Sequence, residues 1–256
     1  VVVNMEARGF AIDKVRLAAL SKKAAEERDA AATVLRQKFN APELNPASPA
    51  QLKTALAGVG ITLESTSEEA LQASGDDRFA PHILAYRNAQ KRVEQTEMLL
   101  QKIDPDGRIH GRFEPTGTET GRFSSKDPNL QNIARGEMRK CFIASPGCSL
   151  VVADYSQIEL RAAAAIANEP RMMEAYRQGA DLHKQTASLV LGISPDTVSK
   201  EDRQLAKAVN FGLLYGMYAG SLVKYAKTSY GVTLTEQHAK QMRDRFFRAY
   251  EGLRRW

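Results

Sequence analysis

Apolar and polar positions recur with helical spacing over most of the first hundred residues. Residues 13–39 are rich in Ala, Leu, Lys and Glu and contain neither Gly nor Pro, which predicts one long helix. Residues 80–103 predict a second long, charged helix. Between them, Ser48-Pro49-Ala50-Gln51 predicts a capping box with proline at the first helical position, and Thr66-Ser67-Glu68-Glu69 predicts the cap of a further helix. Residues 13–107 are therefore predicted to form a helical subdomain.

The pattern changes after residue 107. Residues 108–135 are polar and rich in turn-forming residues, with strand-like pieces at the start. Leu150-Val151-Val152-Ala153 is a short apolar run, and it predicts a buried strand that ends in the carboxylate of Asp154. A helix is predicted to begin near Gln157, and most of the chain beyond Pro170 is also predicted to be helical.

Charge and composition narrow the class of protein. The formal net charge is +6, and a basic protein attracts polyanions, of which nucleic acid is the commonest in a cell. Cys141 and Cys148 form neither a disulfide scaffold nor the paired spacing of a zinc site. No apolar run approaches the roughly 20 residues of a membrane span, and Val1 to Val3 are too few for a signal-peptide core. We expect a cytoplasmic protein without a membrane partner.

Both ends of the sequence look cut. The chain begins on a valine, and it stops at Trp256 inside a helical pattern, with no capping glycine or proline after it. We therefore expect a piece of a longer protein.

The predicted helix that ends at Gly216 carries a stripe of side chains at i,i+4 spacing. The stripe is about 18 Å long at 1.5 Å per residue, and it consists of Arg203, Lys207, Phe211 and Tyr215. Two cations followed by two aromatic rings match the order of a nucleoside triphosphate: anionic tail, sugar and flat base. The alternative is an ordinary amphipathic helix. That alternative has a difficulty, because cations near a helix N-terminus oppose the helix dipole unless an anion is present.

Two other stretches carry candidate chemistry, each with an ordinary alternative. Asp154 is a hard oxygen ligand of the kind Mg²⁺ prefers, but Asp154 or Ser156 can instead cap the following helix. The polar stretch 118–132 offers arginine, amide and hydroxyl donors. Such donors can test the shape of a base pair in the minor groove, where acceptors lie in nearly the same places in every pair. As an isolated loop, the same stretch would be plain surface.

Together these stretches resemble, in the same order, the signature stretches of the bacterial DNA polymerase I family (family A). The stretches are TGRFSS at 120–125, PNLQNIAR at 128–135, DYSQIELR at 154–161 and RQLAKAVNFGLLYG at 203–216. The resemblance covers essentially the whole chain. It implies an α+β right-hand polymerase fold with palm, thumb and fingers, mostly helical, with an incomplete palm sheet. The implied parts are the start of the palm (1–12), a thumb-like helical subdomain (13–107), the palm with its first catalytic strand (108–168) and truncated fingers (169–256).

The resemblance also implies an activity and its residues. The activity is template-directed transfer of a nucleotide from a dNTP to a primer 3′-hydroxyl, with two Mg²⁺ ions, on primer–template DNA. The implied catalytic residues are Asp154, Arg203 and Lys207, and the implied metal ligands are Asp154 and the Tyr155 carbonyl. The implied nucleotide-binding residues are Tyr155, Gln157, Glu159, His183, Arg203, Lys207, Phe211 and Tyr215. The implied DNA contacts are Arg122, Asn129, Gln131, Asn132 and Arg161.

Some features depart from the family pattern. Gln204 stands where many relatives carry an arginine, and Ala134 where proline is usual. The family's third catalytic stretch, a His-Asp pair, does not occur in these residues, so this chain is expected to extend primers poorly by itself. Two alternatives remain open: a single-subunit RNA polymerase relative, which Glu159 argues against, and a non-catalytic DNA-binding fragment. We expect a monomer in a bacterial or phage-infected cell, associated with the nucleoid.

Overall fold

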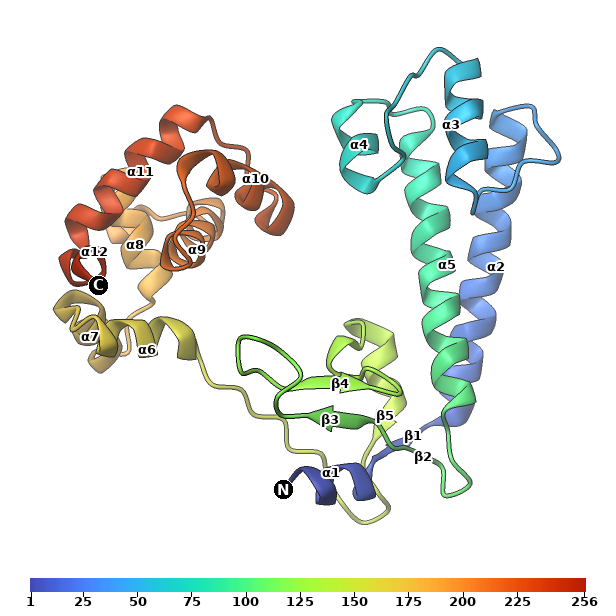
Figure 1. The fold of residues 1–256 in the computed structure, drawn as a ribbon, viewed down its shortest axis with the longest axis horizontal. Coiled ribbons are helices and arrows are strands. Elements are labelled where there is room, and N and C mark those ends of the chain that lie inside the picture. The colour runs from blue at the N-terminus through green and yellow to red at the C-terminus, as the bar shows by residue number, and fades with distance from the viewer. The chain divides into compact units, whose positions relative to one another are not determined.

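The computed structural model describes residues 1–256, which divide into two compact units (Figure 1). The first unit is Val1–Val151 and the second is Val152–Trp256. The helices of the first unit are α1 (Val2–Arg8), α2 (Lys14–Lys38), α3 (Pro49–Gly58), α4 (Glu68–Ala73), α5 (Ala80–Gln101) and the 3₁₀ turns η1 (Leu130–Asn132) and η2 (Gly136–Cys141). Its strands are β1 (Phe10–Ile12), β2 (Arg108–Ile109), β3 (Arg112–Glu114), β4 (Ser124–Lys126) and β5 (Phe142–Ile143).

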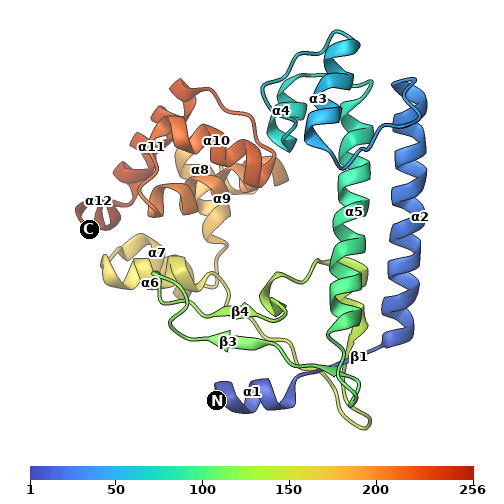
Figure 2. The same cartoon turned by 45° about the vertical axis from the view of Figure 1, so that its right-hand side comes forward.

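Helices α2 and α5 run side by side and antiparallel, as both views show (Figures 1 and 2). Asp13 caps α2, because its carboxylate accepts a hydrogen bond from the Arg16 backbone N–H at 2.9 Å. Each helix buries one apolar stripe, which joins a cluster with α3 and α4 at one end and a cluster with β1, β2 and η2 at the other. Both long helices predicted from the sequence are confirmed.

The serine caps of the two short helices are confirmed as well. Ser48 Oγ accepts a hydrogen bond from Gln51 N at 3.3 Å, and Ser67 Oγ accepts one from Ala70 N at 3.2 Å. The capping box predicted at Ser48-Pro49-Ala50-Gln51 is wrong in its second half, because the Ser48 backbone N–H donates to Asn45 O and not to the Gln51 side chain. The Gln51 side chain accepts a hydrogen bond from Asn45 N at 2.7 Å instead, which fixes the loop that leads into α3.

Two small antiparallel sheets lie below this helical pair in the first unit. One has the strand order β2-β1-β5, with Phe10 opposite Ile109 and Ile12 opposite Phe142. The other pairs β3 with β4, with Phe113 opposite Ser125. The strand-like piece predicted at the start of 108–135 is therefore confirmed.

The strand predicted at residues 150–153 is wrong. This segment has no regular structure, and Val151 and Val152 are each 91% exposed (Figure 1). A strand is stable when a neighbouring strand hydrogen-bonds to its backbone N–H and C=O groups, and none of the five strands is paired with this segment. Asp154 consequently follows an exposed, irregular segment rather than the end of a buried strand.

The second unit is entirely helical. Its elements are α6 (Ile158–Ile166), α7 (Pro170–Arg177), α8 (Leu182–Leu191), η3 (Pro195–Thr197), α9 (Lys200–Leu214), α10 (Ala219–Tyr230), α11 (Glu236–Ala249) and α12 (Glu251–Arg255). Helix α9 packs against α6, α8, α10 and α11 and buries Leu205, Val209 and Leu213 in the main core. A Cβ at Gly212 would lie 2.7 Å from Leu222 Cδ1, so glycine permits the close packing of α9 on α10.

The border between the units falls earlier than the border predicted between palm and fingers. Helix α6, which the sequence grouped with residues 108–168, packs against α7, α9 and α12 in the second unit. The assignment of palm, thumb and fingers to particular residues stays a prediction. None of the helices combines the length and the apolar character needed to cross a bilayer.

Candidate functional site

The stripe predicted on α9 forms the accessible face of that helix. A capping box between Ser199 and Asp202 starts the helix. Arg203, Lys207 and Phe211 are half-buried and Tyr215 is 57% exposed, whereas the residues on the opposite face lie in the core. Two cations and two aromatic rings thus lie along one side of a helix whose other side is packed in the core.

Arg203 already has an anionic partner inside the protein. Its Nε lies 2.6 Å from Asp181 Oδ2. The other oxygen of Asp181 caps α8 by accepting hydrogen bonds from His183 N and Lys184 N. Burial alone would raise the pKa of Asp181, but these bonds and the Arg203 guanidinium hold it below its usual value. The unfavourable position of Arg203 near the α9 N-terminus is therefore balanced by Asp181 without a bound ligand.

Lys207 differs from Arg203 in this respect. Its ammonium forms no ion pair and no hydrogen bond within the 256 residues. A half-buried lysine without a partner keeps its charge available for a ligand.

Four buried side chains form a hydrogen-bonded chain behind the stripe. Asn210 Nδ2 donates to His183 Nδ1 at 2.9 Å, and Thr186 Oγ1 donates to Asn210 Oδ1 at 3.1 Å. Thr186 Oγ1 is also 2.9 Å from the Tyr250 hydroxyl. Because an amide nitrogen only donates, His183 Nδ1 accepts and the ring proton resides on Nε2. His183 is therefore held as a neutral donor through Nε2.

The environment of His183 predicts a loss of stability in acid. Burial and the nearby Arg203 guanidinium lower its pKa from 6.5 to about 4. Above pH 6.5 the ring is neutral in both the folded and unfolded chain. As the pH falls toward 4, His183 takes up a proton in the unfolded chain but not in the folded chain. The free energy of unfolding is therefore expected to fall by up to about 3 kcal/mol.

Urea denaturation at neutral and acid pH checks this expectation. The difference in the free energy of unfolding between the two pH values should be smaller in His183→Gln, because glutamine keeps an amide near Asn210 and cannot titrate. Other groups also titrate in this range, so the contribution of His183 is the change in the free energy of unfolding of the wild type minus that of the variant. An identical pH dependence in both proteins would show that His183 does not respond as stated.

Glu159 and Tyr215 meet although they are far apart in sequence. The Tyr215 hydroxyl donates to Glu159 Oε2 at 2.7 Å. Glu159 is in the first turn of α6, where a carboxylate is also stabilised by the helix dipole. The structure therefore brings the predicted sugar-selecting carboxylate and the ring at the end of the stripe into direct contact.

Gln157 and Arg161 are both engaged by Tyr176. Gln157 has a left-handed backbone (φ 55°) just before α6, and its Oε1 accepts from the Tyr176 hydroxyl at 3.1 Å. The Arg161 guanidinium carbon lies 4.1 Å from the centre of the Tyr176 ring, and its Nε donates to Ser156 O at 2.8 Å. These contacts fix the turn that connects the predicted metal ligand with α6. The roles of Gln157 at the nucleotide and Arg161 at DNA stay predictions.

Asp154 and Tyr155 stand apart from these contacts. Both are exposed, Tyr155 by 81%, and the Asp154 carboxylate has no hydrogen-bond or ionic partner. Helix α6 has no side-chain cap, so the alternative in which Asp154 or Ser156 caps it is not observed. No group of three or more His, Cys, Asp or Glu side chains is placed to hold a metal ion.

The candidate DNA-contacting residues of the first unit flank β4: Arg122 precedes the strand, and Asn129, Gln131 and Asn132 lie on an ordered turn after it. Ser125 Oγ donates to Pro128 O and accepts from Leu130 N at 3.1 Å, which holds the turn closed. Asn129 is exposed, and its Oδ1 accepts from Gln131 N at 3.0 Å while its amide N–H groups make no hydrogen bond within the protein. Arg122, Asn129, Gln131 and Asn132 are all exposed. Their contact with DNA stays a prediction.

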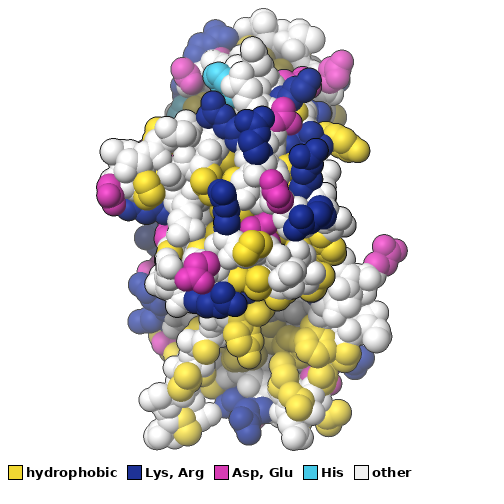
Figure 3. Space-filling view, turned by 90° about the vertical axis from the view of Figure 1, so that its left-hand side faces the viewer, with side chains coloured by type: hydrophobic (Ala, Val, Ile, Leu, Met, Phe, Trp, Pro, Cys, Tyr) yellow, Lys and Arg dark blue, Asp and Glu magenta, His cyan; other side chains and the backbone are white.

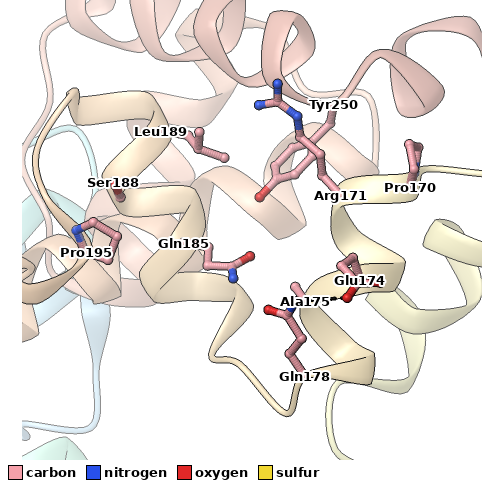
Figure 4. A pocket seen from close by; sticks show the side chains of 10 residues that line it. All are labelled: Pro170, Arg171, Glu174, Ala175, Gln178, Gln185, Ser188, Leu189, Pro195 and Tyr250. Carbon is pink, nitrogen blue, oxygen red and sulfur yellow. Dashed lines mark hydrogen bonds between the residues drawn. The ribbon is translucent and has the colours of Figure 1, made fainter.

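A separate hollow of about 490 Å³ lies between α7, α8 and η3 (Figure 4). Gln178 and Glu174 face it and are joined by a hydrogen bond of 2.8 Å, and the Tyr250 ring closes one side. None of the residues predicted to bind nucleotide, DNA or metal lines this hollow. This hollow of the second unit is thus distinct from the candidate site.

The sequence interpretation missed the residues that hold the site in place. Asp181 had a local signal, since an aspartate before a helical pattern is a cap, but its pairing with Arg203 crosses 22 positions. Asn210 gave a weaker signal, as an amide among apolar residues in the middle of a helix. Tyr176 gave none.

Comparisons with known proteins agree on one family. The sequence profile described as DNA polymerase family A matches residues 14–256. DNA polymerase I of Aquifex aeolicus is 36% identical over 260 residues, which are 100% of this chain and 45% of that protein. The thermostable DNA polymerase I of Thermus thermophilus is 36% identical over 279 residues, which are 100% of this chain and 32% of that protein. The chain thus spans less than half the length of these relatives.

A solved structure gives the same result for the fold. The POL domain of Pol1 from M. smegmatis, in complex with DNA primer-template and dNTP, superposes with a TM-score of 0.86 at 30% identity. The match covers 99% of this chain and 47% of that one. The predicted α+β polymerase fold is confirmed, and the chain belongs to DNA polymerase family A.

Proposed function

We propose that the chain is part of an enzyme that copies a DNA template by transferring nucleotides from dNTPs to a primer 3′-hydroxyl. Arg203 and Lys207 would bind the triphosphate, Phe211 would pack near the sugar, and Tyr215 would lie beneath the new base pair. His183 would donate to a phosphate oxygen through Nε2. The M. smegmatis relative described as a complex with DNA primer-template and dNTP supports this proposal.

The observation that carries the proposal is the hydrogen bond between Tyr215 and Glu159 at the end of the α9 stripe. It places a carboxylate beside the aromatic end of a helix whose other end is cationic. A nucleotide aligned with this stripe would have its sugar near Glu159. A carboxylate held there excludes a 2′-hydroxyl by its volume and by leaving that hydroxyl without room for water.

The family uses divalent metal ions, and we propose that two Mg²⁺ ions serve the complete site. Mg²⁺ is commonly held by one or two carboxylates together with substrate phosphates. The unpartnered carboxylate of Asp154 and the carbonyl of Tyr155 fit one side of such a site. Bound there, the metal would lower the pKa of the primer hydroxyl and offset charge on the leaving pyrophosphate. Asp154 does not belong to any group of three or more His, Cys, Asp or Glu side chains that could hold a metal ion by itself.

Matched-nucleotide binding tests the proposal without requiring turnover. The chain is mixed with a primer–template whose next template base is known, and the affinity for each of the four dNTPs is measured by fluorescence titration with Mg²⁺. We expect the complementary dNTP to bind more tightly than the other three. Equal affinities for all four, or equal binding without DNA, would overturn template-directed selection.

Replacing Glu159 with alanine should make the site less selective for deoxyribose. Removal of the carboxylate opens room beside the sugar, so the ratio of dNTP to rNTP affinity is expected to fall about tenfold or more, since a buried steric and polar conflict is worth about 1–3 kcal/mol. The measurement is the same titration with dGTP and GTP opposite a template C.

The matched control for Glu159→Ala is Tyr215→Phe. It keeps the ring and removes only the hydroxyl that holds Glu159, so a smaller fall in the ratio is expected. If neither variant changes the ratio, Glu159 does not select the sugar. A wild-type chain that prefers rNTPs would favour the RNA polymerase alternative instead.

A further inference from the structure

The C-terminal helices of the second unit carry a concentration of positive charge that the α9 site does not use. Residues 236–256 include six Lys or Arg and three Asp or Glu, so a short segment holds half of the net charge of +6. Lys240, Arg243 and Phe247 follow one another at helical spacing on α11. Lys and Arg side chains gather on the face of the molecule shown in Figure 3.

A groove in this region is lined by residues of α11 and α12. It has a volume of about 410 Å³ and is lined by Arg243, Asp244, Phe247, Arg248 and Arg254. The Arg243 guanidinium carbon lies 5.5 Å from the centre of the Phe247 ring. Its Nη1 is 3.8 Å from Asp244 Oδ1, at the outer limit of an ion pair. One carboxylate thus faces three guanidinium groups.

Two of these guanidinium groups have no partner inside the protein. The side chains of Arg248 and Arg254 are exposed and form neither an ion pair nor a hydrogen bond. Like charges brought together repel one another, and an anion in the groove would relieve that repulsion. Planar guanidinium groups suit phosphate oxygens, because two parallel N–H groups can bind one phosphate.

The aromatic ring in the groove indicates the kind of anion. Proteins that bind single-stranded nucleic acid combine cations along the backbone with aromatic rings on which bases stack. Phe247 is half-buried between Arg243 and Arg248, so part of its ring is accessible beside the cations. The carboxylates of an acidic peptide could bind the guanidinium groups but do not stack on a ring, whereas every nucleotide carries a base that can.

We propose that this groove, formed by α11 and α12, binds the sugar-phosphate backbone and a base of single-stranded nucleic acid. No residue of the α9 stripe lines it. The groove is therefore a second nucleic-acid site, separate from the site for the incoming nucleotide. It needs neither primer, nucleotide nor metal.

Fluorescence anisotropy with a labelled oligothymidylate of about 16 nucleotides, a length within the site sizes of single-strand binders, tests the proposal. The test variant is Arg248→Ala/Arg254→Ala in the full chain. Each lost phosphate contact should reduce the slope of log K against log salt by about 0.7. Two lost contacts give a slope change of about 1.4, which corresponds to roughly 25-fold weaker binding at 0.1 M salt.

The control is Lys224→Ala/Lys227→Ala, which removes two exposed charges from α10 in the same unit. We expect it to have a much smaller effect. A second variant, Phe247→Leu, keeps apolar packing and removes the ring, so binding should weaken about fivefold with an unchanged salt slope. Circular dichroism confirms that each variant is folded.

Three results would overturn the proposal. Equal losses in the two double variants would show that only total charge matters. A loss in Arg203→Ala/Lys207→Ala with none in the groove variant would move binding to the α9 stripe. Competition by polyglutamate as strong as that by the oligonucleotide would assign the groove to acidic protein segments. None of these results bears on whether the α9 site selects a matched dNTP.

Discussion

Replacing Lys207 with alanine is expected to weaken dNTP binding about 10- to 100-fold. The ammonium group lies on the accessible face of α9 and has no partner within the protein. A charge-assisted hydrogen bond is worth about 1.5–3 kcal/mol, and the triphosphate is the ligand that would supply its acceptor. Because Lys207 has no internal partner, its removal leaves no orphaned charge. Isothermal titration of the chain with dNTP and Mg²⁺ measures the change directly.

The comparison with Arg203 sharpens this prediction. Arg203→Ala would also remove a cation, but it would leave Asp181 partly buried with one fewer partner. That variant should therefore lose stability as well as affinity, whereas Lys207→Ala should lose affinity alone. Lys227→Ala, on the exposed side of α10, is the charge-matched control and should bind dNTP as the wild type does. Unchanged affinity in Lys207→Ala would remove this lysine from the proposed nucleotide site.

Helices whose start is set by residues close in sequence could be predicted from the sequence. Helix α9 begins where Ser199 and Asp202 cap each other, and the 3.6-residue period fixes which side chains share its accessible face. The same holds for α2 after Asp13 and for α3 after Ser48. In each case the signal and the structure lie within a few residues.

The apolar run at 150–153 shows where local reading fails. Four apolar residues in a row are equally compatible with a strand and with an irregular segment, and only a partner strand decides between them. None of the five strands pairs with residues 150–153, so Val151 and Val152 remain exposed. Asp154 stays a predicted metal ligand, and the buried strand that was predicted to support it is absent from this structure.

The hydrogen-bonded chain of side chains behind the stripe could not be predicted from the sequence, for a different reason. His183 and Asn210 are 27 positions apart, and Thr186 and Tyr250 are 64 apart. Their hydrogen bonds exist because α8, α9 and α11 pack together, and the side-chain pattern of each helix alone does not encode the pairing. The family resemblance supplied His183 as a candidate, yet its buried position and its neutral state come only from the packing.

Gly252→Ala is expected to destabilise the second unit by about 3 kcal/mol or more. A Cβ at this position would lie 2.8 Å from Ala167 O and 2.9 Å from both Glu169 Cα and Glu169 Oε2. Two of these neighbours are backbone atoms, which cannot move aside as easily as the end of a flexible side chain can. Gly252 N also donates to the buried Glu169 carboxylate at 2.7 Å. Overpacking costs about 1–3 kcal/mol, and a buried charged group that loses a donor costs more.

Urea denaturation followed by circular dichroism measures this loss, and Gly220→Ala provides the matched control. Gly220 lies in the first turn of α10, where an added Cβ would meet only Glu236 Oε1 at 4.0 Å. Alanine favours a helix over glycine by up to about 1 kcal/mol, so Gly220→Ala should be neutral or slightly stabilising. Equal stability of the two variants would mean that α12 can shift away from Ala167 without cost. In that case, Glu169 would not fix α12 to the turn between α6 and α7.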